Sequence, residues 1–138
     1  MEFMLILLAD REAPEDPSLY PEMGRYAGEL AGSGNLRGGA PLHPEAEGAR
    51  VTGDGVMLGP FPSRVVVGGY FLIDCKSRAE AIEIARRCPH TRVGTVEVRT
   101  HLRIVPPFRG QHRLEQLAVF GQPGRDHSEV RRLAAALL

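Results

Sequence analysis

An α+β sandwich, with two helices on one side of a mainly antiparallel sheet, is the fold class that this sequence predicts. Three observations support it. Segments with the apolar period of a strand alternate along the chain with segments that have the period of a helix. One helix begins at a recognisable capping motif, and one strand is apolar on both faces. At 138 residues, the chain is long enough for one self-sufficient core.

The first predicted elements are a strand and a helix. Residues 3–9, FMLILLA, are apolar at odd and at even positions, as in a strand that is covered on both faces. A helix is expected to open at Ser18 or at the neighbouring Tyr20-Pro21, and the GSG of residues 32–34 is expected to end it. Its apolar stripe comprises Met23, Tyr26, Ala27, Leu30 and Ala31.

The middle of the chain predicts a loop and then a hairpin. Residues 35–48 are expected to form an ordered loop with Leu36 and Leu42 as anchors. ARVTGDGVML, residues 49–58, has two β-prone segments around Asp54-Gly55, a pair that supplies the positive φ angles of a tight turn.

A long strand, a second helix and a last strand follow. In VVVGGYFLID, residues 65–74, Gly68-Gly69 indicates a bulge or a close approach of two backbones. SRAE, residues 77–80, has the spacing of a capping box, and Pro89 is expected to stop the helix that it opens. The buried stripe of this helix comprises Ala81, Ile84, Ala85 and Cys88. GTVEVRT, residues 94–100, alternates strictly between apolar and polar positions.

The order β, α, hairpin, β, α, β is the plan of a ferredoxin-like α+β sandwich. Both helices lie on one side of the sheet in this plan, so the other side has no helix to cover it. Because residues 3–9 are apolar toward both sides, a second copy of the same sheet is the simplest cover. We therefore expect a homodimer that forms through the open sheet face.

The predicted domain spans residues 1–101, and residues 102–138 are expected to be a C-terminal extension packed on the same domain. Asp126 and Glu129 have capping spacing and precede an apolar stripe, so this extension is expected to end in a helix.

The charges balance overall, with 17 basic and 17 acidic residues, but not along the chain. Residues 1–75 carry 5 Arg against 11 acids, whereas residues 76–138 carry 12 Arg or Lys against 6 acids. Two interpretations are open: the acidic and basic halves neutralise each other in the fold, or the basic half contacts an acidic partner or a phosphate. Nucleic acid is disfavoured, because no dense basic block with interleaved aromatic residues occurs.

Membrane insertion, a disulfide, metals and cofactors are not expected. The apolar run at residues 3–9 is too short to span a bilayer and lacks a basic head, so we expect a cytoplasmic protein. A predicted helix about 16 Å long separates Cys75 from Cys88, which favours two core thiols over a disulfide. The histidine and cysteine spacings match no metal site, and neither a phosphate-binding glycine loop nor a serine elbow is present.

Four motifs in order resemble a known family. GAPLHP (39–44), LGPF (58–61), GGYFLIDCKSRAEAIEIARRCP (68–89) and GTVEVR (94–99) together look like the YCII-related, DGPF-domain proteins. The resemblance covers about residues 2–101 and implies a dimeric α/β barrel of ferredoxin-like subunits. It also implies a family with largely unestablished activity, whose members are proposed as small enzymes or are encoded beside extracytoplasmic-function sigma factors.

The resemblance also singles out His43 and shows a departure. The family histidine is proposed as half of a His/Asp pair, which would make His43 a general acid or base. The aspartate of the DGPF motif is replaced here by Leu58, and Pro62-Ser63-Arg64 follows Phe61. His43 is then a catalytic residue with a substitute acid, a ligand contact without chemistry, or a loop histidine bonded to backbone.

The other candidate site residues come from the predicted strands and from the proline-rich loop, GPFPSR, residues 59–64. Asp74 and Asp54 are the two possible substitute acids. The alternatives are a loop or helix-entry residue for Asp74 and, favoured over the acid, a turn residue for Asp54. Glu97 and Arg99 project to one face, either as an ion pair between strands or subunits or as a site for an anionic group. Tyr70 lines the same cavity or belongs to the core, and Phe61 is expected to form a pocket wall.

Three functions are consistent with these residues. The first is a homodimeric small-molecule-binding protein with its pocket near His43, Phe61, Glu97 and Arg99. The second is an isomerase, lyase or hydrolase that acts on a small organic acid through His43, with Asp74 or Glu97 as partner. The third is a regulatory partner of a transcription factor. An exposed basic patch would support it, comprising Arg103, Arg109, Arg113, Arg131 and Arg132.

Overall fold

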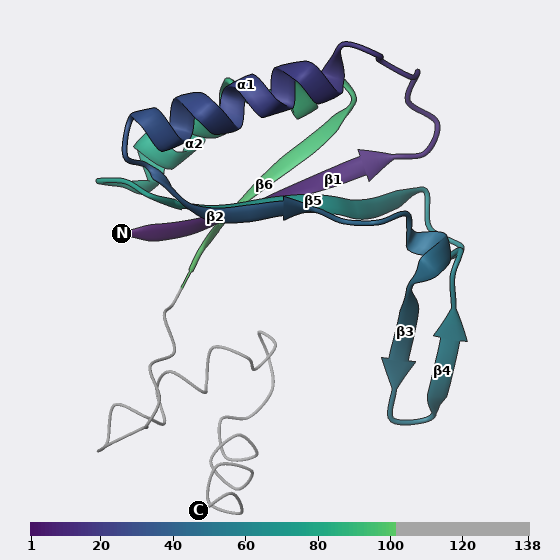
Figure 1. Ribbon diagram of the computed structural model, residues 1–138. Helices are drawn as coiled ribbons and strands as arrows, with labels where there is room; N and C mark the ends of the chain where they lie inside the picture. Colours follow the sequence, from purple (N-terminus) through teal and green to yellow (C-terminus); the bar gives the residue numbers. More distant parts are fainter. Residues whose placement is uncertain (102–138) are drawn as a thin grey trace, which may run out of the picture. The chain divides into compact units, whose positions relative to one another are not determined.

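Two helices pack on one side of a four-stranded antiparallel sheet in the computed structural model of the protein, which describes residues 1–101 (Figure 1). The elements are β1 (Glu2–Asp10), α1 (Leu19–Gly32), β2 (Leu36–Pro41), the 3-10 helix η1 (Glu45–Glu47), β3 (Ala49–Thr52), β4 (Gly55–Leu58), β5 (Val65–Asp74), α2 (Arg78–Arg86), the 3-10 helix η2 (Pro89–Arg92) and β6 (Gly94–Thr100). The order in the main sheet is β2-β5-β1-β6, and β3 and β4 form a second sheet of two strands. The predicted α+β fold is confirmed and is consistent with a ferredoxin-like plan.

Strand β1 lies in the middle of the main sheet and is apolar on both faces, as predicted. Phe3 and Leu5 are fully buried under the helices, and Leu7 is 7% exposed. The alternate side chains Met4, Ile6 and Leu8 are only half-buried and point to the opposite side. We call this opposite side the open face. Its side chains are Met4, Ile6 and Leu8 from β1, Val67, Tyr70 and Leu72 from β5, and Thr95, Glu97 and Arg99 from β6.

The buried core joins both helices to the sheet. Tyr26 donates a hydrogen bond from its hydroxyl to the Ile84 carbonyl at 2.8 Å, and its ring meets Phe71 edge-on with centroids 5.6 Å apart. Burial raises the pKa of Tyr26, so the hydroxyl keeps its proton and remains a donor. The predicted stripe of α2 is buried throughout, whereas the stripe predicted for α1 is wrong at Ala31, which is exposed.

The two helices start in different ways. At α2, Ser77 Oγ accepts a hydrogen bond from Glu80 N at 3.2 Å, which confirms the predicted cap. The Glu80 carboxylate accepts from Lys76 N at 2.6 Å rather than from the Ser77 amide, so the reciprocal contact is one residue earlier than in a capping box. At α1, Ser18 is the N-cap residue, but its side chain makes no capping bond and donates to Asp16 instead.

Both interpretations of Gly68-Gly69 are confirmed. Leu7 pairs with Gly69 and Leu8 pairs with Val67, so Gly68 is the extra residue of a β-bulge. A Cβ atom on Gly69 would stand 2.8 Å from the Ala40 carbonyl oxygen, which is too close for any other residue.

The loop predicted for residues 35–48 is wrong over its first half. Leu36–Pro41 forms β2, the edge strand beside β5, and only the Leu36 anchor packs against the core. Leu42 is 48% exposed. Gly38 and Gly39 have low strand propensity, so the side-chain pattern of residues 36–41 does not indicate a strand. Backbone pairing with β5 stabilises β2 instead.

The predicted hairpin exists, but its turn lies one residue earlier than predicted. Thr52 pairs with Gly55, so Gly53 and Asp54 are the turn residues. Within residues 1–101, only Gly34 and Gly39 have positive φ angles, so this turn does not use the geometry that Asp54-Gly55 was expected to supply.

The two cysteines are free and buried, as expected, and burial is the main cause that raises the pKa of each thiol. No helix among the described residues is long and apolar enough to cross a membrane. The predicted C-terminal extension and its terminal helix lie outside the described residues.

Ion pairs join the ends of β1 and β5. Arg64 Nε donates to both carboxylate oxygens of Asp10 at 3.1 Å, and Arg11 N donates to the Arg64 carbonyl at 3.0 Å. The Arg64 side chain, followed by the Glu12 backbone amide, holds the pKa of Asp10 below its usual value.

Removing the Ser77 cap is expected to destabilise the protein by about 1 kcal/mol, because Ser77→Ala leaves an amide donor of α2 without its partner. Urea unfolding followed by circular dichroism measures the change. Ser18→Ala is the matched control and should cost less than about 0.5 kcal/mol, since its hydroxyl makes no capping bond. Equal losses in the two variants would contradict this account.

Asp10→Asn is expected to lower stability near neutral pH but not in acid. A carboxyl with a lowered folded pKa stabilises the fold above its unfolded value of 3.8, and that stabilisation is lost as pH falls through the folded value. Thermal melts at about pH 6 and about pH 2.5 measure the change, which is small because the pair is exposed and screened by salt. Asp54→Asn, whose carboxylate has no ion-pair partner within residues 1–101, should match the wild type at both values. A deficit of Asp10→Asn that persists in acid would mean that the carboxylate charge is not its cause.

Candidate functional site

The structure places the predicted site residues in three places. Tyr70, Glu97 and Arg99 lie on the open face of the main sheet. His43 and Phe61 lie in the loops that follow β2 and precede β5. Asp74 lies at the far end of β5.

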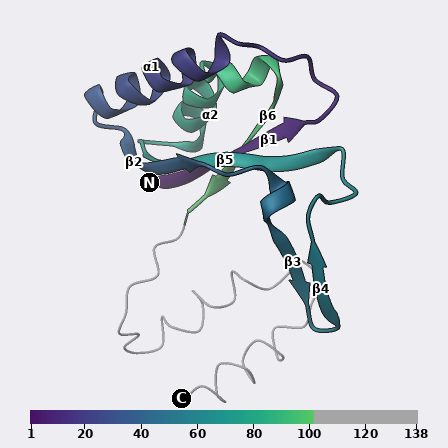
Figure 2. The same cartoon turned by 45° about the vertical axis from the view of Figure 1, so that its right-hand side comes forward.

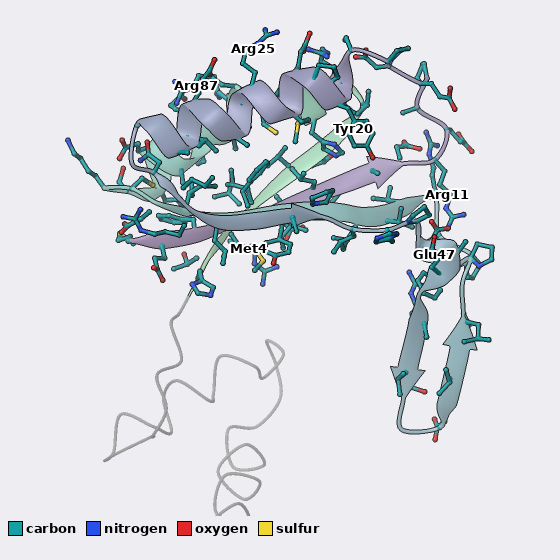
Figure 3. All side chains as sticks on the ribbon, in the orientation of Figure 1. Met4, Arg11, Tyr20, Arg25, Glu47 and Arg87 are labelled. Carbon is teal, nitrogen blue, oxygen red and sulfur yellow. The ribbon has the colours of Figure 1, made fainter. Side chains whose placement is uncertain are left out.

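The open face has an apolar floor with polar groups on both sides. Ile6 pairs with Tyr70 on one neighbouring strand and with Glu97 on the other, so these two side chains stand about 10 Å apart across it. Met4 is flanked in the same way by Leu72 and Arg99. In Figure 3, the labelled Met4 lies on the side of the sheet away from the helices. The open face therefore has an apolar strip between the Tyr70 phenol and the Glu97–Arg99 ion pair.

The ion pair on β6 is formed within one strand. Arg99 Nη1 donates to Glu97 Oε1 at 2.8 Å, and the two side chains are 68% and 40% exposed. Among residues 1–101, the other guanidinium nitrogens of Arg99 have no hydrogen-bond partner. They remain available to a planar anion such as a carboxylate.

A contact between a histidine and a carboxylate joins the start of β1 to the residue after β6 and was not predicted. His101 Nδ1 stands 3.2 Å from Glu2 Oε2, with the side chains 32% and 18% exposed. These residues are 99 positions apart and meet because β1 and β6 run antiparallel. No local signal in the sequence connects them, so only the sheet register brings them together.

The proline-rich loop is packed around Phe61. The guanidinium carbon of Arg50 lies 4.2 Å from the centroid of the Phe61 ring, a cation–π contact. Arg11 Nη2 donates to the Phe61 carbonyl at 2.7 Å and also pairs with Glu45 of η1. The Gly59–Pro60 peptide is cis, and a Cβ atom on Gly59 would overlap the Glu45 carbonyl. This packing fixes the loop beside the 3-10 helix.

His43 is largely in solvent and faces one carboxylate. Its side chain is 87% exposed, and its Nδ1 lies 3.5 Å from Glu47 Oε2. Pro41 ends β2 just before it, and Pro44 precedes η1 just after it. Glu47 was not singled out from the sequence, although the spacing of four residues in HPEAE was a usable signal.

The structure does not bring Asp74 or Glu97 to His43. Leu42, the neighbour of His43, donates a backbone hydrogen bond from its N to the Gly68 carbonyl of β5. Asp74 lies six residues beyond Gly68 along the same strand, which is about 20 Å in extended backbone. Asp74 instead pairs with the Met1 amine at 3.1 Å and Arg37 at 3.3 Å, and the hydrogen bond from the amine is the main cause that lowers its pKa. Glu97 is on β6, the opposite edge of the sheet from β2.

The charged side chains of residues 1–101 do not assemble a metal centre. No group of three or more histidine, cysteine or acidic side chains in this part of the chain lies close enough together to hold a metal ion.

Comparison with known proteins identifies the family. A solved structure similar to this chain is 5-chloro-2-hydroxyhydroquinone dehydrochlorinase from Burkholderia phenoliruptrix AC1100, in complex with 2,5-dihydroxybenzoquinone. The two are 16% identical, with a TM-score of 0.46 over 74% of this chain and 94% of that chain. No curated protein sequence matches. The family model of the YCII-related domain matches residues 1–105. Since this match spans well over half of the sequence, the chain belongs to the YCII-related family.

Proposed function

We propose that the protein is a homodimeric small-molecule-binding protein and that it takes a small organic anion on the open face of its sheet. The observation that carries the proposal is the apolar strip of Ile6 and Met4 between Tyr70 and Arg99. A ligand with an apolar body would lie on the strip. Its carboxylate would reach the guanidinium nitrogens that Glu97 leaves unoccupied, and a polar group at its other end would reach the Tyr70 hydroxyl.

The same face supports the dimer. Met4, Ile6, Leu8 and Leu72 are half-buried, and Val67 is 47% exposed, so residues 1–101 by themselves leave a contiguous apolar surface in water. A second sheet packed face to face about 10 Å away would cover it and form the dimeric α/β barrel. A closed space between the sheets would also exclude water, which strengthens the contact between Arg99 and an anion.

An acid/base enzyme is the second candidate function, and the contact of His43 with Glu47 favours it. A carboxylate beside Nδ1 orients the imidazole and leaves Nε2 free to exchange a proton with a substrate. The substrate class would again be a small organic acid. Glu47 replaces Asp74 and Glu97 as the partner, because neither of those lies near His43.

The third function, regulation of a transcription or sigma factor, depends on the basic residues after position 101. Arg103, Arg109, Arg113, Arg131 and Arg132 lie outside the described residues, so this function remains a prediction from the sequence alone.

The ligand class is tested by calorimetric titration with acetate and benzoate. Benzoate is expected to bind more tightly, because its ring covers the apolar strip. Arg99→Gln should weaken benzoate binding about tenfold, the typical effect of losing one charged hydrogen bond. Arg25→Gln is the matched control, since the labelled Arg25 lies on the outer side of α1 (Figure 3), and it should bind like the wild type. Absence of benzoate binding at millimolar concentration, or equal binding by Arg99→Gln, would rule out this ligand class.

The role of His43 is tested by His43→Ala. If His43 contacts the ligand, benzoate affinity should fall several-fold, whereas size-exclusion chromatography with light scattering should give the same dimer, because the side chain is exposed and outside the core. Glu47→Gln should lower affinity less than His43→Ala, since it removes only the partner of the imidazole. Unchanged affinity in both variants would leave His43 without a binding role.

A further inference from the structure

The β3–β4 hairpin has one face that is entirely apolar. Its pairs are Ala49 with Leu58, Arg50 with Met57, Val51 with Val56 and Thr52 with Gly55. Paired residues share a face, so the side chains of Ala49, Val51, Val56 and Leu58 lie together. Val51 and Leu58 are each 74% exposed and Val56 is 65% exposed. Nothing within residues 1–101 covers this face.

The other face of the hairpin is held to the proline-rich loop. Arg50 lies over Phe61, and its Nη2 donates to Ser63 Oγ at 3.1 Å. At the base of the hairpin, Gly59 N donates to the Gly48 carbonyl at 2.9 Å. The polar face is therefore anchored, while the apolar face is presented outward.

An isolated two-stranded hairpin is marginally stable in water, and a third layer is normally needed. Three large apolar side chains that are each about two-thirds exposed or more on one short element are also unusual for a lone subunit. The apolar face of the hairpin therefore requires a cover.

We propose that this hairpin, residues 49–58, is an arm that packs its apolar face against the open face of a second copy of the chain. This inference rests on the homodimer of the proposed function and adds to it. Each copy gives one arm and receives one, so a two-fold axis forms both contacts at once. The received arm closes the edge of the ligand site and excludes water from it.

The position of the arm supports a second copy as its partner. Figures 1 and 2 show the hairpin on the side of the main sheet opposite the helices, which is the side of the open face. Val65 and Val67, which are 46% and 47% exposed, extend the open face along β5 toward the loop that leads from the arm. The two apolar surfaces of one chain thus face the same side, where a symmetry-related copy presents the same two surfaces.

The areas favour the same arrangement. A face of four strands and about seven residues measures roughly 19 by 23 Å, on the order of 440 Å² in projection. The received arm lies on the open face, whose area is already counted, so only the donated arm, roughly 10 by 13 Å, adds surface and brings the total to about 570 Å² per copy. Stable interfaces bury roughly 800 Å² per partner, so the sheet face alone falls well short and the donated arm reduces the shortfall by about a third.

Photo-cross-linking tests the arm. A benzophenone amino acid is placed at Val56, and the protein is irradiated as the full chain. The expected product is a covalent dimer whose cross-linked peptide comes from residues 3–8 or 65–72 of the other copy. Ile82, which is 39% exposed on α2, is the matched control and should give no covalent dimer.

The other outcomes separate the two proposals. Light scattering of the wild type is measured first, and a monomer at micromolar concentration would overturn both the dimer and the arm. A dimer with no cross-link from Val56, or with a cross-link to residues 102–138 or to the open face of the same chain, would overturn only the arm.

A second measurement does not depend on the cross-linker. Val51→Ser combined with Val56→Ser is expected to raise the dimer dissociation constant at least tenfold, because each copy loses two buried apolar side chains. Met57→Ser changes the opposite face of the hairpin and should leave the constant within about threefold. Equal effects of the two variants would contradict the arm.

Discussion

Burial of the central strand β1 is the constraint on which the rest of the structure depends. Its odd-numbered side chains, Phe3, Leu5 and Leu7, fill the space under α1 and α2, and removing them from water is a major driving force of folding. The even-numbered side chains, Met4, Ile6 and Leu8, are also apolar, but no helix of residues 1–101 lies over them. Within residues 1–101, one layer of helices therefore covers only one face of β1, and in the proposed dimer the other face forms the contact.

The remaining apolar surfaces share one physical explanation. Within residues 1–101, the open face and the β3–β4 hairpin each expose apolar side chains that no second layer covers, and such surfaces are unfavourable in water. In the proposed dimer, both are covered by the same neighbour, and the covered space contains Tyr70 and Arg99. Association and ligand binding would then be coupled, because a phenol and a guanidinium interact more strongly with an anion when water is excluded.

Short-range patterns predicted most of the elements, and the failures have a common cause. The Ser77 cap, the Gly68 bulge and the alternation of residues 94–100 are properties of a few adjacent residues, so they were visible in the sequence. Strand β2 was missed because Gly38 and Gly39 carry no side-chain signal, and its existence depends on hydrogen bonds to β5, some thirty residues later. The hairpin turn lies at Gly53-Asp54, one residue before the predicted Asp54-Gly55, because the pairing register of β3 and β4 sets its position rather than the turn preference of single residues.

The site follows the same division. The sequence by itself determined which chemical groups the chain has, that Glu97 and Arg99 share a face, and that β1 is apolar on both sides, because these depend on the two-residue period of a strand. Only the tertiary structure decided which groups meet. Antiparallel pairing joins Glu2 to His101, and the length of β5 separates Asp74 from His43. Both relations are between residues that are distant along the chain. They depend on strand register and strand length in the assembled sheet, which no local sequence pattern encodes.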